Sequence, residues 1–528
     1  MIKQGIWVVV AVLWAALSFA DATDSASCGV VIDSVIIDNR NIYDLDDPQY
    51  DHWIFRLANA FNIKTKKWVI HQELLLDKGD VYSEVLAEET AHNLRSLPYI
   101  WNAGVCLRQV DSATILQVTT SDRWSLVGGP SVNRSAGETT YQLGFEETNF
   151  LGYGHFVGVN VFVRDFDDDF YSLAYVYPRL FGGGLTFDGY RNTAPGIGIS
   201  WLQVSLPWLS LSQRYSFLTA YEHTDRRNDY YRDGVIVAQD EVRGDDFVGK
   251  VSQRLGGYHY KFLTALYYKY MDVRSCNRRQ YADDVSVTFS SDSLYHFAEG
   301  QVGVEHIQYI KTRRINMFSR DEDVDLVTGV YLKLGRAWNA GSGAKLYDKF
   351  TLEAHLDRYW RRHLLLIDYE RNEWYNGEVS FRKRQDVSIR YYYNGLKWLT
   401  PLVSIQHTRD IRLDRMRFLY LGGNEGIRGY PRNYCNGEKR LLINVEPRFF
   451  PGIRVMAHEV GAAMFVDLGQ CWNHGETLEM SDLNWTIGAG IRIGAERIAQ
   501  EEVLRIDLAY AGRSKTWEIS FGMGQFIN

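Results

Sequence analysis

One arginine stands in a setting that an ordinary loop does not require. Arg428 lies in LYLGGNEGIRGYPRNY, a stretch too rich in glycine for a helix or an ordinary strand. Its planar guanidinium can hold a carboxylate through two parallel hydrogen bonds, which fixes geometry as well as adding energy. Taken alone, Arg428 would be a charged side chain in a solvated surface loop. The alternative is a loop that folds back into a polar interior, where the arginine could contact a carboxylate. The residues alone leave both placements of Arg428 open.

Catalytic patterns are missing from the chain. The sequence lacks G-x-S-x-G, H-E-x-x-H and G-x-x-x-x-G-K-[ST]. We expect no enzyme activity, no cofactor and no bound metal. No C-x-x-C pair occurs among the five cysteines, which are Cys28, Cys106, Cys276, Cys435 and Cys471. A disulfide between Cys28 and Cys106 stays open, because connectivity cannot be read from sequence.

Composition narrows the class of protein. The net charge is -7 with no basic tract, so nucleic acid is not an expected partner. Aromatic residues make up 14% of the chain, yet mean hydropathy is only -0.27. That combination is typical of a membrane β-barrel, whose strands alternate between lipid and water and whose rims carry aromatic side chains.

The first 22 residues are expected to be a signal peptide. Lys3 precedes an apolar run at 6–19, and Ala-Asp-Ala at 20–22 is a small-x-small cleavage site. The alternative, a membrane anchor helix, needs about 20 apolar residues. No later run is long enough for such a helix. Two interpretations follow from the residues alone, a secreted soluble β protein or a closed barrel in the outer membrane.

Residues 23–122 carry a mixed pattern. A strand at 30–38 precedes apolar residues at helical spacing in DHWIFRLANAF and SEVLAEETAHNLRSLP, and two strands follow at 105–110 and 113–120. This order, with VIHQELLLDKGDVYSEVLAEETAHNLRSLPYIWNAGV, resembles a POTRA domain. POTRA domains are periplasmic modules that present a sheet edge to polypeptides. The resemblance implies one small α+β POTRA domain over 23–122, because there is room for only one.

Residues 123–528 show two-residue alternation. In HFVGVNVFVRDF four valines share one face, and glycine, asparagine and arginine share the other. Polar tracts such as EHTDRRNDYYRDG, FSRDEDVD and AWNAGSGAKLYD are interpreted as turns and long external loops. At about 25 residues per strand and connection, the segment predicts a membrane all-β domain, a 16-stranded antiparallel transmembrane β-barrel.

The C-terminal motifs carry a second resemblance. GIRGYP resembles the sixth extracellular loop of the outer-membrane assembly-barrel superfamily of the BamA/TamA type, with the tetrad Ile427, Arg428, Gly429 and Tyr430. INVEPRFFP, MFVDLGQCW, IGAGIRIG and LRIDLAYAG follow in the family's order, and ETNFLGYGH resembles its first hairpin. MFVDLGQCW contains an F-x-D-x-G strand motif, made of Phe465, Asp467 and Gly469.

The resemblance implies two sites. In the family the loop folds into the barrel lumen, where its arginine meets acidic groups, here Asp467 and Glu446. The other site is the seam between the first and last strands, expected near 139–147 and 516–526. The seam residues are Tyr141, Phe521, Gly522 and Gly524. Glycine weakens a strand interior, which suits a seam that opens, but it also leaves packing space inside the lumen, and the two interpretations stay open.

The implied function is handling of polypeptides at the outer membrane of a Gram-negative bacterium. The POTRA domain, in the periplasm, would dock an unfolded or partly folded client, and the seam or lumen would insert or translocate it. Implied partners are outer-membrane lipid, such clients, and accessory periplasmic or outer-membrane proteins. The alternative is a passive pore or structural barrel that has kept the architecture.

Overall fold

The computed structural model describes residues 29–525 except 136–137, 166–167, 195–197, 233–234, 282–290, 319–320, 413–418, 424–425, 496 and 499–502. The signal peptide expected at 1–22, and Cys28, lie outside the described residues. Within the described residues, no helix has both the length and the apolar character needed to cross a bilayer.

The N-terminal domain is a small three-stranded sheet with helices packed on it. Its elements are β1 (Ser34–Arg40), η1 (Pro48–Tyr50), α2 (Trp53–Phe61), α3 (Lys67–His71), α4 (Glu84–Ser96), β2 (Ile100–Val110) and β3 (Ala113–Asp122). The strand order is β1-β3-β2, with β1 parallel and β2 antiparallel to β3. The strand, helix, helix, strand, strand order expected from the sequence is present, with the short α3 inserted between the two expected helices.

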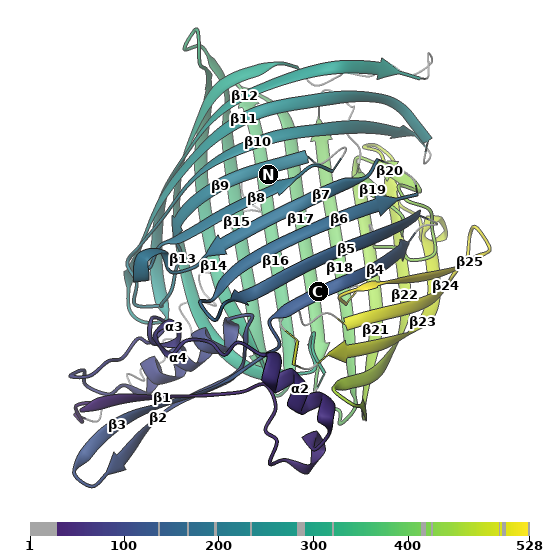
Figure 1. Ribbon diagram of the computed structural model, residues 1–528. Helices are drawn as coiled ribbons and strands as arrows, with labels where there is room; N and C mark the ends of the chain where they lie inside the picture. Colours follow the sequence, from purple (N-terminus) through teal and green to yellow (C-terminus); the bar gives the residue numbers. More distant parts are fainter. Residues whose placement is uncertain are drawn as a thin grey trace.

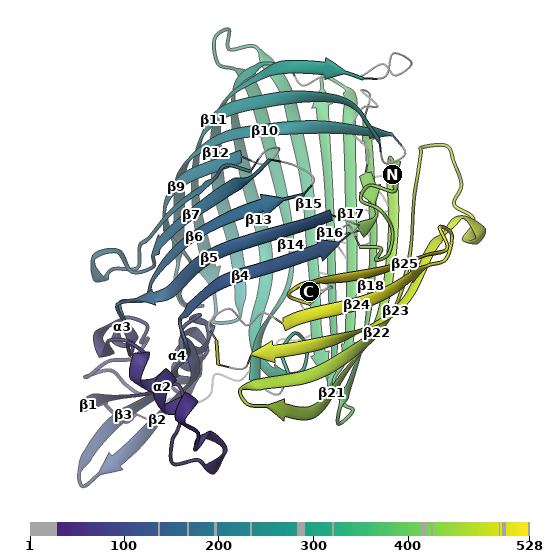
Figure 2. The ribbon, with the colours of Figure 1, turned by 45° about the vertical axis from the view of Figure 1, so that its right-hand side comes forward.

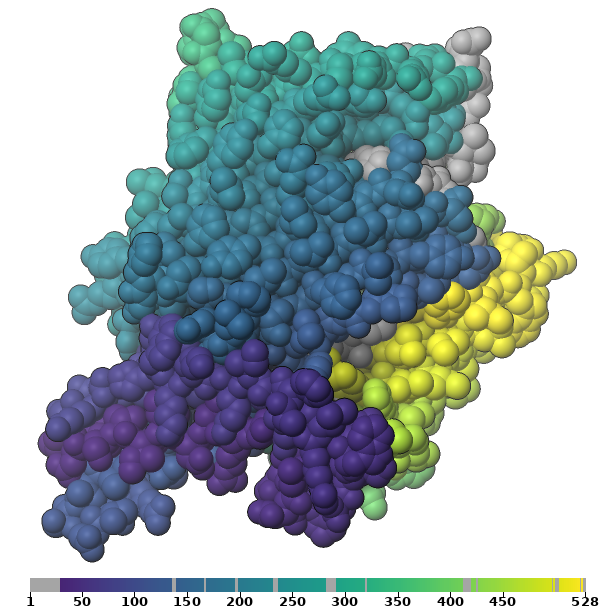
Figure 3. All heavy atoms as spheres, in the orientation of Figure 1, coloured from purple at the N-terminus to yellow at the C-terminus, as the bar shows by residue number. Residues whose placement is uncertain are grey.

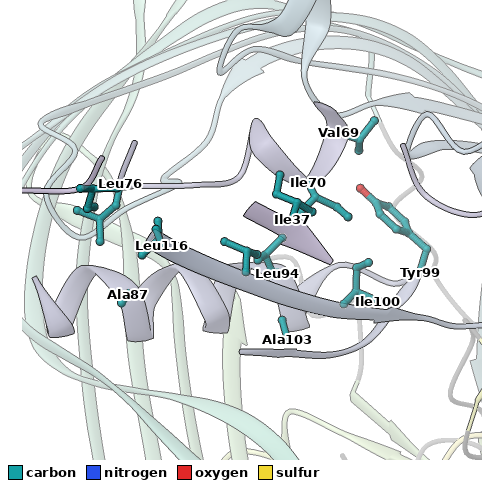
Figure 4. Close-up of a cluster of buried hydrophobic side chains, with 12 residues drawn as sticks. Ile37, Val69, Ile70, Leu76, Ala87, Leu94, Tyr99, Ile100, Ala103 and Leu116 are labelled. Carbon is teal, nitrogen blue, oxygen red and sulfur yellow. The ribbon is translucent and has the colours of Figure 1, made fainter. Parts of the chain in front are cut away.

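Apolar side chains from α3, α4 and all three strands form the core of this domain. Leu94, Ile70, Ile100 and Leu116 are fully buried in it, and Figure 4 shows them converging between the helices and the sheet. Burial of side chains of this size stabilises a fold by about 1.5–3 kcal/mol each. The helix predicted from the apolar spacing in SEVLAEETAHNLRSLP is α4, and Leu94 is its innermost residue.

Helix α2 presents its apolar stripe to the outside. Trp53, Leu57 and Phe61 are 65%, 44% and 69% exposed, respectively. The buried face is instead that of Phe55, whose ring packs on Tyr43 with 4.6 Å between centroids. Helical spacing identified the helix, but tertiary packing chose the buried face.

A closed barrel follows the N-terminal domain. In the described residues it has 20 strands, which close in the order β4 to β18 and then β21 to β25. Its first ten strands are β4 (Leu126–Ser135), β5 (Glu138–Phe150), β6 (His155–Arg164), β7 (Phe170–Tyr177), β8 (Thr186–Asn192), β9 (Gly198–Leu206), β10 (Tyr215–Arg232), β11 (Val235–Gly256), β12 (Tyr260–Gln280) and β13 (Ser293–Arg313). The other ten are β14 (Asp321–Asn339), β15 (Lys345–Trp360), β16 (His363–Asn376), β17 (Val379–Tyr393), β18 (Leu399–Arg412), β21 (Lys439–Val455), β22 (His458–Trp472), β23 (Asn484–Ala495), β24 (Val503–Ala511) and β25 (Thr516–Met523). Figures 1 and 2 show β25, in yellow, beside β4, in blue.

The wall is apolar outside and polar inside. Val159, Val161 and Val163 of β6 are 46–47% exposed, whereas Asn160 between them is buried. Because successive side chains of a strand point to opposite faces, the alternation in the sequence sets which residues face outward. Together with the closed strand order, this alternation confirms the expected closed antiparallel barrel.

The expected count of 16 strands is wrong. The count assumed that polar tracts are loops, but EHTDRRNDYYRDG mostly continues β10, and FSRDEDVD supplies the start of β14. Strands β10 to β13 run for 18–22 residues, longer than an apolar band requires. Charged residues can extend a strand beyond that band because pairing needs only the backbone. The count was too low because other strands are short: β6 to β9 have 7–10 residues each, so a strand with its connection takes fewer than the ~25 residues assumed.

The N-terminal domain sits against one end of the barrel. Figure 1 shows its helices α3 and α4 facing the strand ends, with its sheet on the far side. Figure 3 shows the purple atoms of the domain packed along the lower edge of the blue strands. We call this end of the barrel the mouth.

Candidate functional site

The segment between β18 and β21 folds against the inner wall of the barrel. It contains a short hairpin, β19 (Leu419–Leu421) and β20 (Cys435–Gly437), in which Leu421 pairs with Cys435. Ile427 and Tyr430 are almost fully buried. Both pack in a cluster with the inward-facing Leu442, Cys471 and Ala511 of β21, β22 and β24. We call residues 421–437 the luminal loop.

Glycine allows the loop to approach the wall. Gly429 has φ of +82°, in the left-handed region that other residues adopt only at a cost. A β-carbon there would also stand 3.3 Å from the methyl group of Ala509. Gly429 therefore lets the loop press against the wall at this position.

Arg428 is the centre of the loop's contacts with the wall. Its Nε and Nη2 donate to the two carboxylate oxygens of Asp467 at 2.8 and 2.7 Å, and Nη1 donates to Glu446 at 2.7 Å. The guanidinium lies 3.5 Å from the centroid of the Phe465 ring, and Thr486 donates to the Arg428 carbonyl at 2.7 Å. The structure thus brings together the arginine, both acidic residues and the phenylalanine named from the sequence.

More charged residues surround this contact than the sequence motifs indicated. Arg492 and Arg505 donate to Asp507 at 2.5 and 3.0 Å, and Arg448 donates to Glu446 at 2.9 Å. We call the whole group the arginine cluster: Arg428, Arg448, Arg492, Arg505, Glu446, Asp467 and Asp507. All seven residues are buried.

The missed members had a signal in the sequence. Arg492 lies in IGAGIRIG and Asp507 in LRIDLAYAG, each in step with the inward-facing residues of its strand. A charge at an inward position of an otherwise apolar strand marks a luminal contact. Gly490 on the same face of β23 leaves room for it, since a β-carbon there would meet Asp507 at 1.9 Å.

Every carboxylate of the arginine cluster is paired. Each carboxylate accepts from at least one guanidinium, so that burial of these charges is offset by partners. Buried ion pairs add little net stability relative to apolar packing, but removal of one partner is strongly destabilising because it leaves a buried charge. The cluster therefore fixes where the loop lies.

The closure, the pairing of β4 with β25, is described in part, because residues 136–137 and 526–528 lie outside the described residues. Among the described residues, β4 and β25 pair at one position, Arg134 with Phe521. Strand β4 pairs with β5 at ten positions and β24 with β25 at eight. Gly522 is buried near Asn133, and Gly524 has φ of +84° just past the end of β25.

Tyr141 does not lie at the closure. It belongs to β5, where it pairs with Val132 of β4 and Val163 of β6, and its side chain is 52% exposed. The expectation that 139–147 forms the first strand is corrected, because β4 precedes it. Strand β4, LVGGPSVNRS, contains two glycines and a proline, which hid it from a search for alternation.

Helix α4 contacts the mouth through charged and aromatic side chains. Arg95 donates to both oxygens of Asp323 on β14 at 2.7 Å. Glu89 accepts from the Tyr258 hydroxyl at 2.5 Å, and the His92 ring stacks on Tyr309 with 4.0 Å between centroids. A cavity of about 650 Å³ remains beside these contacts, between the end of α4 and residues 316–325.

Buried carboxylates fasten the domain at other turns. Glu73 pairs with Arg179 in the turn between β7 and β8, and burial raises the pKa of Glu73 while the arginine opposes the rise. Asp122 accepts from the Thr65 hydroxyl at 3.0 Å, and Asn149 donates to the same hydroxyl at 2.9 Å. Burial also raises the pKa of Asp122, with its hydrogen bonds opposing.

Arg497, between β23 and β24, joins the N-terminal domain to the barrel close to the start of β4. Its guanidinium lies 5.1 Å from the ring centroids of Tyr50 and Trp101, and 5.5 Å from that of Tyr43. Trp124, the residue that leads from the domain into β4, donates its backbone N–H to the Arg497 carbonyl at 2.8 Å. The domain thus holds the barrel at β14 and again beside β24.

Comparison with known proteins gives weak overall likeness. No protein-family model and no curated protein matches the chain. Solved structures similar to it include BamA from Haemophilus ducreyi lacking POTRA domains 1–3, at 11% identity and a TM-score of 0.38, covering 92% of this chain and 84% of that one.

Two further solved structures are CdiB proteins. CdiB from Acinetobacter baumannii matches at 13% identity and a TM-score of 0.44, over 87% of this chain and 72% of that one. CdiB from Escherichia coli matches at 12% identity and a TM-score of 0.45, over 95% and 79%. Values this low leave the function to be argued from the site itself.

Proposed function

We propose that this chain is an outer-membrane protein that inserts or translocates client polypeptides. The N-terminal domain receives an unfolded or partly folded client on its periplasmic side, and the closure or the lumen passes the client onward. Strand β2 is an edge of its sheet and offers backbone groups to an added strand. Accessory periplasmic or outer-membrane proteins are the other partners we infer.

The make-up of the closure is the observation that carries this proposal. In lipid every backbone polar group needs a partner, so a well-paired seam opens only at great expense. Strand β25 has eight residues, and β4 contains two glycines and a proline, so fewer hydrogen bonds hold this seam than join the long strands β10 to β13. An incoming strand would replace them and supply more, and burial of the client's own apolar surface would drive the process.

The outer face supports a lipid location. Large apolar side chains at outward positions, such as Val251, Leu266 and Leu334, are 60–72% exposed. Extended apolar surface of this kind is unfavourable in water and marks contact with lipid or another protein. Inward positions, by contrast, hold the buried charges of the arginine cluster.

Reconstitution tests the proposal. The chain is placed in liposomes, an unfolded barrel client is added, and the fraction of client that becomes folded in the membrane is measured over time. We expect faster insertion than in empty liposomes. Deletion of 23–121 should abolish the acceleration. Equal rates with and without the chain would refute the proposal.

A disulfide lock across the closure sharpens the test. In a background with every native cysteine replaced by Ser, R134C with F521C bridges the paired position of β4 and β25. The matched control, L508C with I519C, bridges a paired position of β24 and β25. Oxidation of the first pair should stop client insertion and reduction should restore it, whereas the control pair should have no effect in either state.

The second candidate is a passive pore. The strand number favours it, since barrels of 16–18 strands already leave an aqueous channel and this barrel has 20. Salt conductance across liposomes that is unchanged by deletion of 23–121, with no acceleration of client insertion, would select the pore.

A further inference from the structure

The second half of the inner face of β22 contacts the luminal loop. The inward positions of β22 are every second residue, and all of them are buried. Phe465 and Asp467 contact Arg428 through the ring and the carboxylate. The next inward position is Gly469, where a β-carbon would stand 2.7 Å from Ile427. The loop therefore contacts three successive inward positions of β22.

The last inward position of β22 is Cys471, and the loop brings Cys435 to it. Strand β20 lies over the end of β22, since a β-carbon on Gly437 would stand 2.6 Å from the backbone nitrogen of Trp472. Cys435 packs against the cluster that contains Cys471, which is 7% exposed. Both cysteines therefore contribute side chains to the same apolar cluster at the end of β22.

We propose that Cys435 and Cys471 form a disulfide that ties the luminal loop to the barrel wall. The inference rests on the proposed function only in that export places the chain in an oxidising compartment. One S–S bond forms and two S–H bonds break. The two electrons and two protons pass to a disulfide-bearing oxidant, which is reduced to two thiols by thiol–disulfide exchange.

The bond would hold the loop where the arginine cluster already places it. Cys435 follows Arg428 in the loop, and Cys471 lies near the end of β22, the strand that also carries Asp467. The loop would therefore be attached to β22 by an ion pair and by a covalent bond. Closing a segment of about 35 residues also restricts the unfolded chain. The loop could then leave the lumen only after reduction, while β4 and β25 remain free to part.

Two other described cysteines serve as controls. Cys106 is exposed on β2, and Cys276 lies half-buried on β12 next to Glu241. The structure records all four described cysteines as free thiols. Neither Cys106 nor Cys276 shares the packing cluster of the pair.

Peptide mapping tests the bond directly on the full chain. The protein is exported in cells, purified without reductant, treated with iodoacetamide and digested. We expect a peptide pair joining Cys435 to Cys471 that separates on reduction, and an alkylated Cys276. Linkage of either cysteine to a different one overturns the proposal. So does alkylation of both after the detergent-solubilised protein has been incubated with oxidised glutathione.

The same experiment separates failure of the bond from failure of the proposed function. A bond that forms with oxidised glutathione but is missing from cell-purified protein supports the geometry and overturns export to an oxidising compartment. A bond present in protein that does not accelerate client insertion supports the disulfide and overturns the insertion activity. Neither result depends on a variant that folds poorly.

Stability gives a second measurement. Dithiothreitol should lower the urea midpoint of the wild-type barrel and of C276S, whereas C435S should show the same midpoint with and without it. Equal loss on reduction in C435S would assign the effect to another bond and overturn the proposal.

Discussion

The wall formed by β21 to β24 and the closure formed by β25 and β4 are adjacent in the barrel and are held together in opposite ways. The wall carries most of the arginine cluster, which is buried and charged, and hydrogen bonds from Arg428 to Glu446 and Asp467 join it to the luminal loop. The closure has one paired position among the described residues and a glycine at its inward face. A wall held by buried ion pairs and a closure of short, glycine-containing strands thus lie side by side.

The largest expected effect comes from the centre of the cluster. R428A leaves Asp467 and Glu446 buried without their main partner, and we expect a loss of about 3–5 kcal/mol. The urea midpoint in detergent, followed by the heat-dependent shift of the folded band on gels, measures it. R336A removes an exposed pair with Asp348 and should leave the midpoint unchanged. Equal small effects of R428A and R336A would mean that the cluster does not hold the wall.

The next effect concerns the contact between α4 and β14. R95A leaves Asp323 without its two hydrogen bonds, and removal of a partner from a largely buried charge costs about 1–3 kcal/mol. We expect the N-terminal domain to detach from the mouth, so that hydrogen exchange in α4 becomes faster while exchange in the strands β21–β24 is unchanged. R108A, on the exposed part of β2, is the matched control. Unchanged hydrogen exchange of α4 in R95A would show that the remaining contacts, such as Glu73 with Arg179, are enough to hold the domain on the barrel.

A smaller effect distinguishes the two roles of the glycine at the closure. A β-carbon on Gly522 would lie 3.4 Å from Asn133, which is ordinary contact. G522A should therefore stabilise β25 by about 0.5–1 kcal/mol through lower entropy of the unfolded chain. If weak pairing matters for function, G522A slows client insertion. G249A, in open space on β11, should gain similar stability without slowing insertion. If the two variants insert clients equally fast, Gly522 serves packing alone.

The smallest effect is expected at Tyr141. Because its outward-facing side chain lies on β5 away from the closure, Y141A should change stability by no more than about 0.5 kcal/mol and leave client insertion unaltered. In a cysteine-free background, Y141C with F521C should not cross-link, whereas R134C with F521C should. A cross-link from 141 would restore the earlier placement of the first strand.

Local patterns were enough for the character of the barrel, whereas the partners of Arg428 came from the resemblance to the assembly-barrel superfamily. Alternation marked the inward and outward faces, as in Val159 and Asn160, because a strand has a period of two whatever its neighbours. The order of the C-terminal motifs indicated Asp467 and Glu446, which the structure places against the arginine. Neither the strand number nor the first strand could be found this way, since β10 and β14 contain charged tracts and β4 contains Gly128, Gly129 and Pro130.

The sequence by itself determined which residues face the lumen, that a helix spans the apolar spacing around Leu94, and that an arginine stands in a loop unsuited to the surface. Only the tertiary structure decided that four arginines share three carboxylates, that α2 turns Trp53 outward, and that β25 meets β4 at Phe521 and Arg134. The physical reason is range. Periodicity and turn chemistry act within a few residues, whereas ion pairs and strand closure join residues far apart in the chain, and their geometry exists only after the barrel has closed.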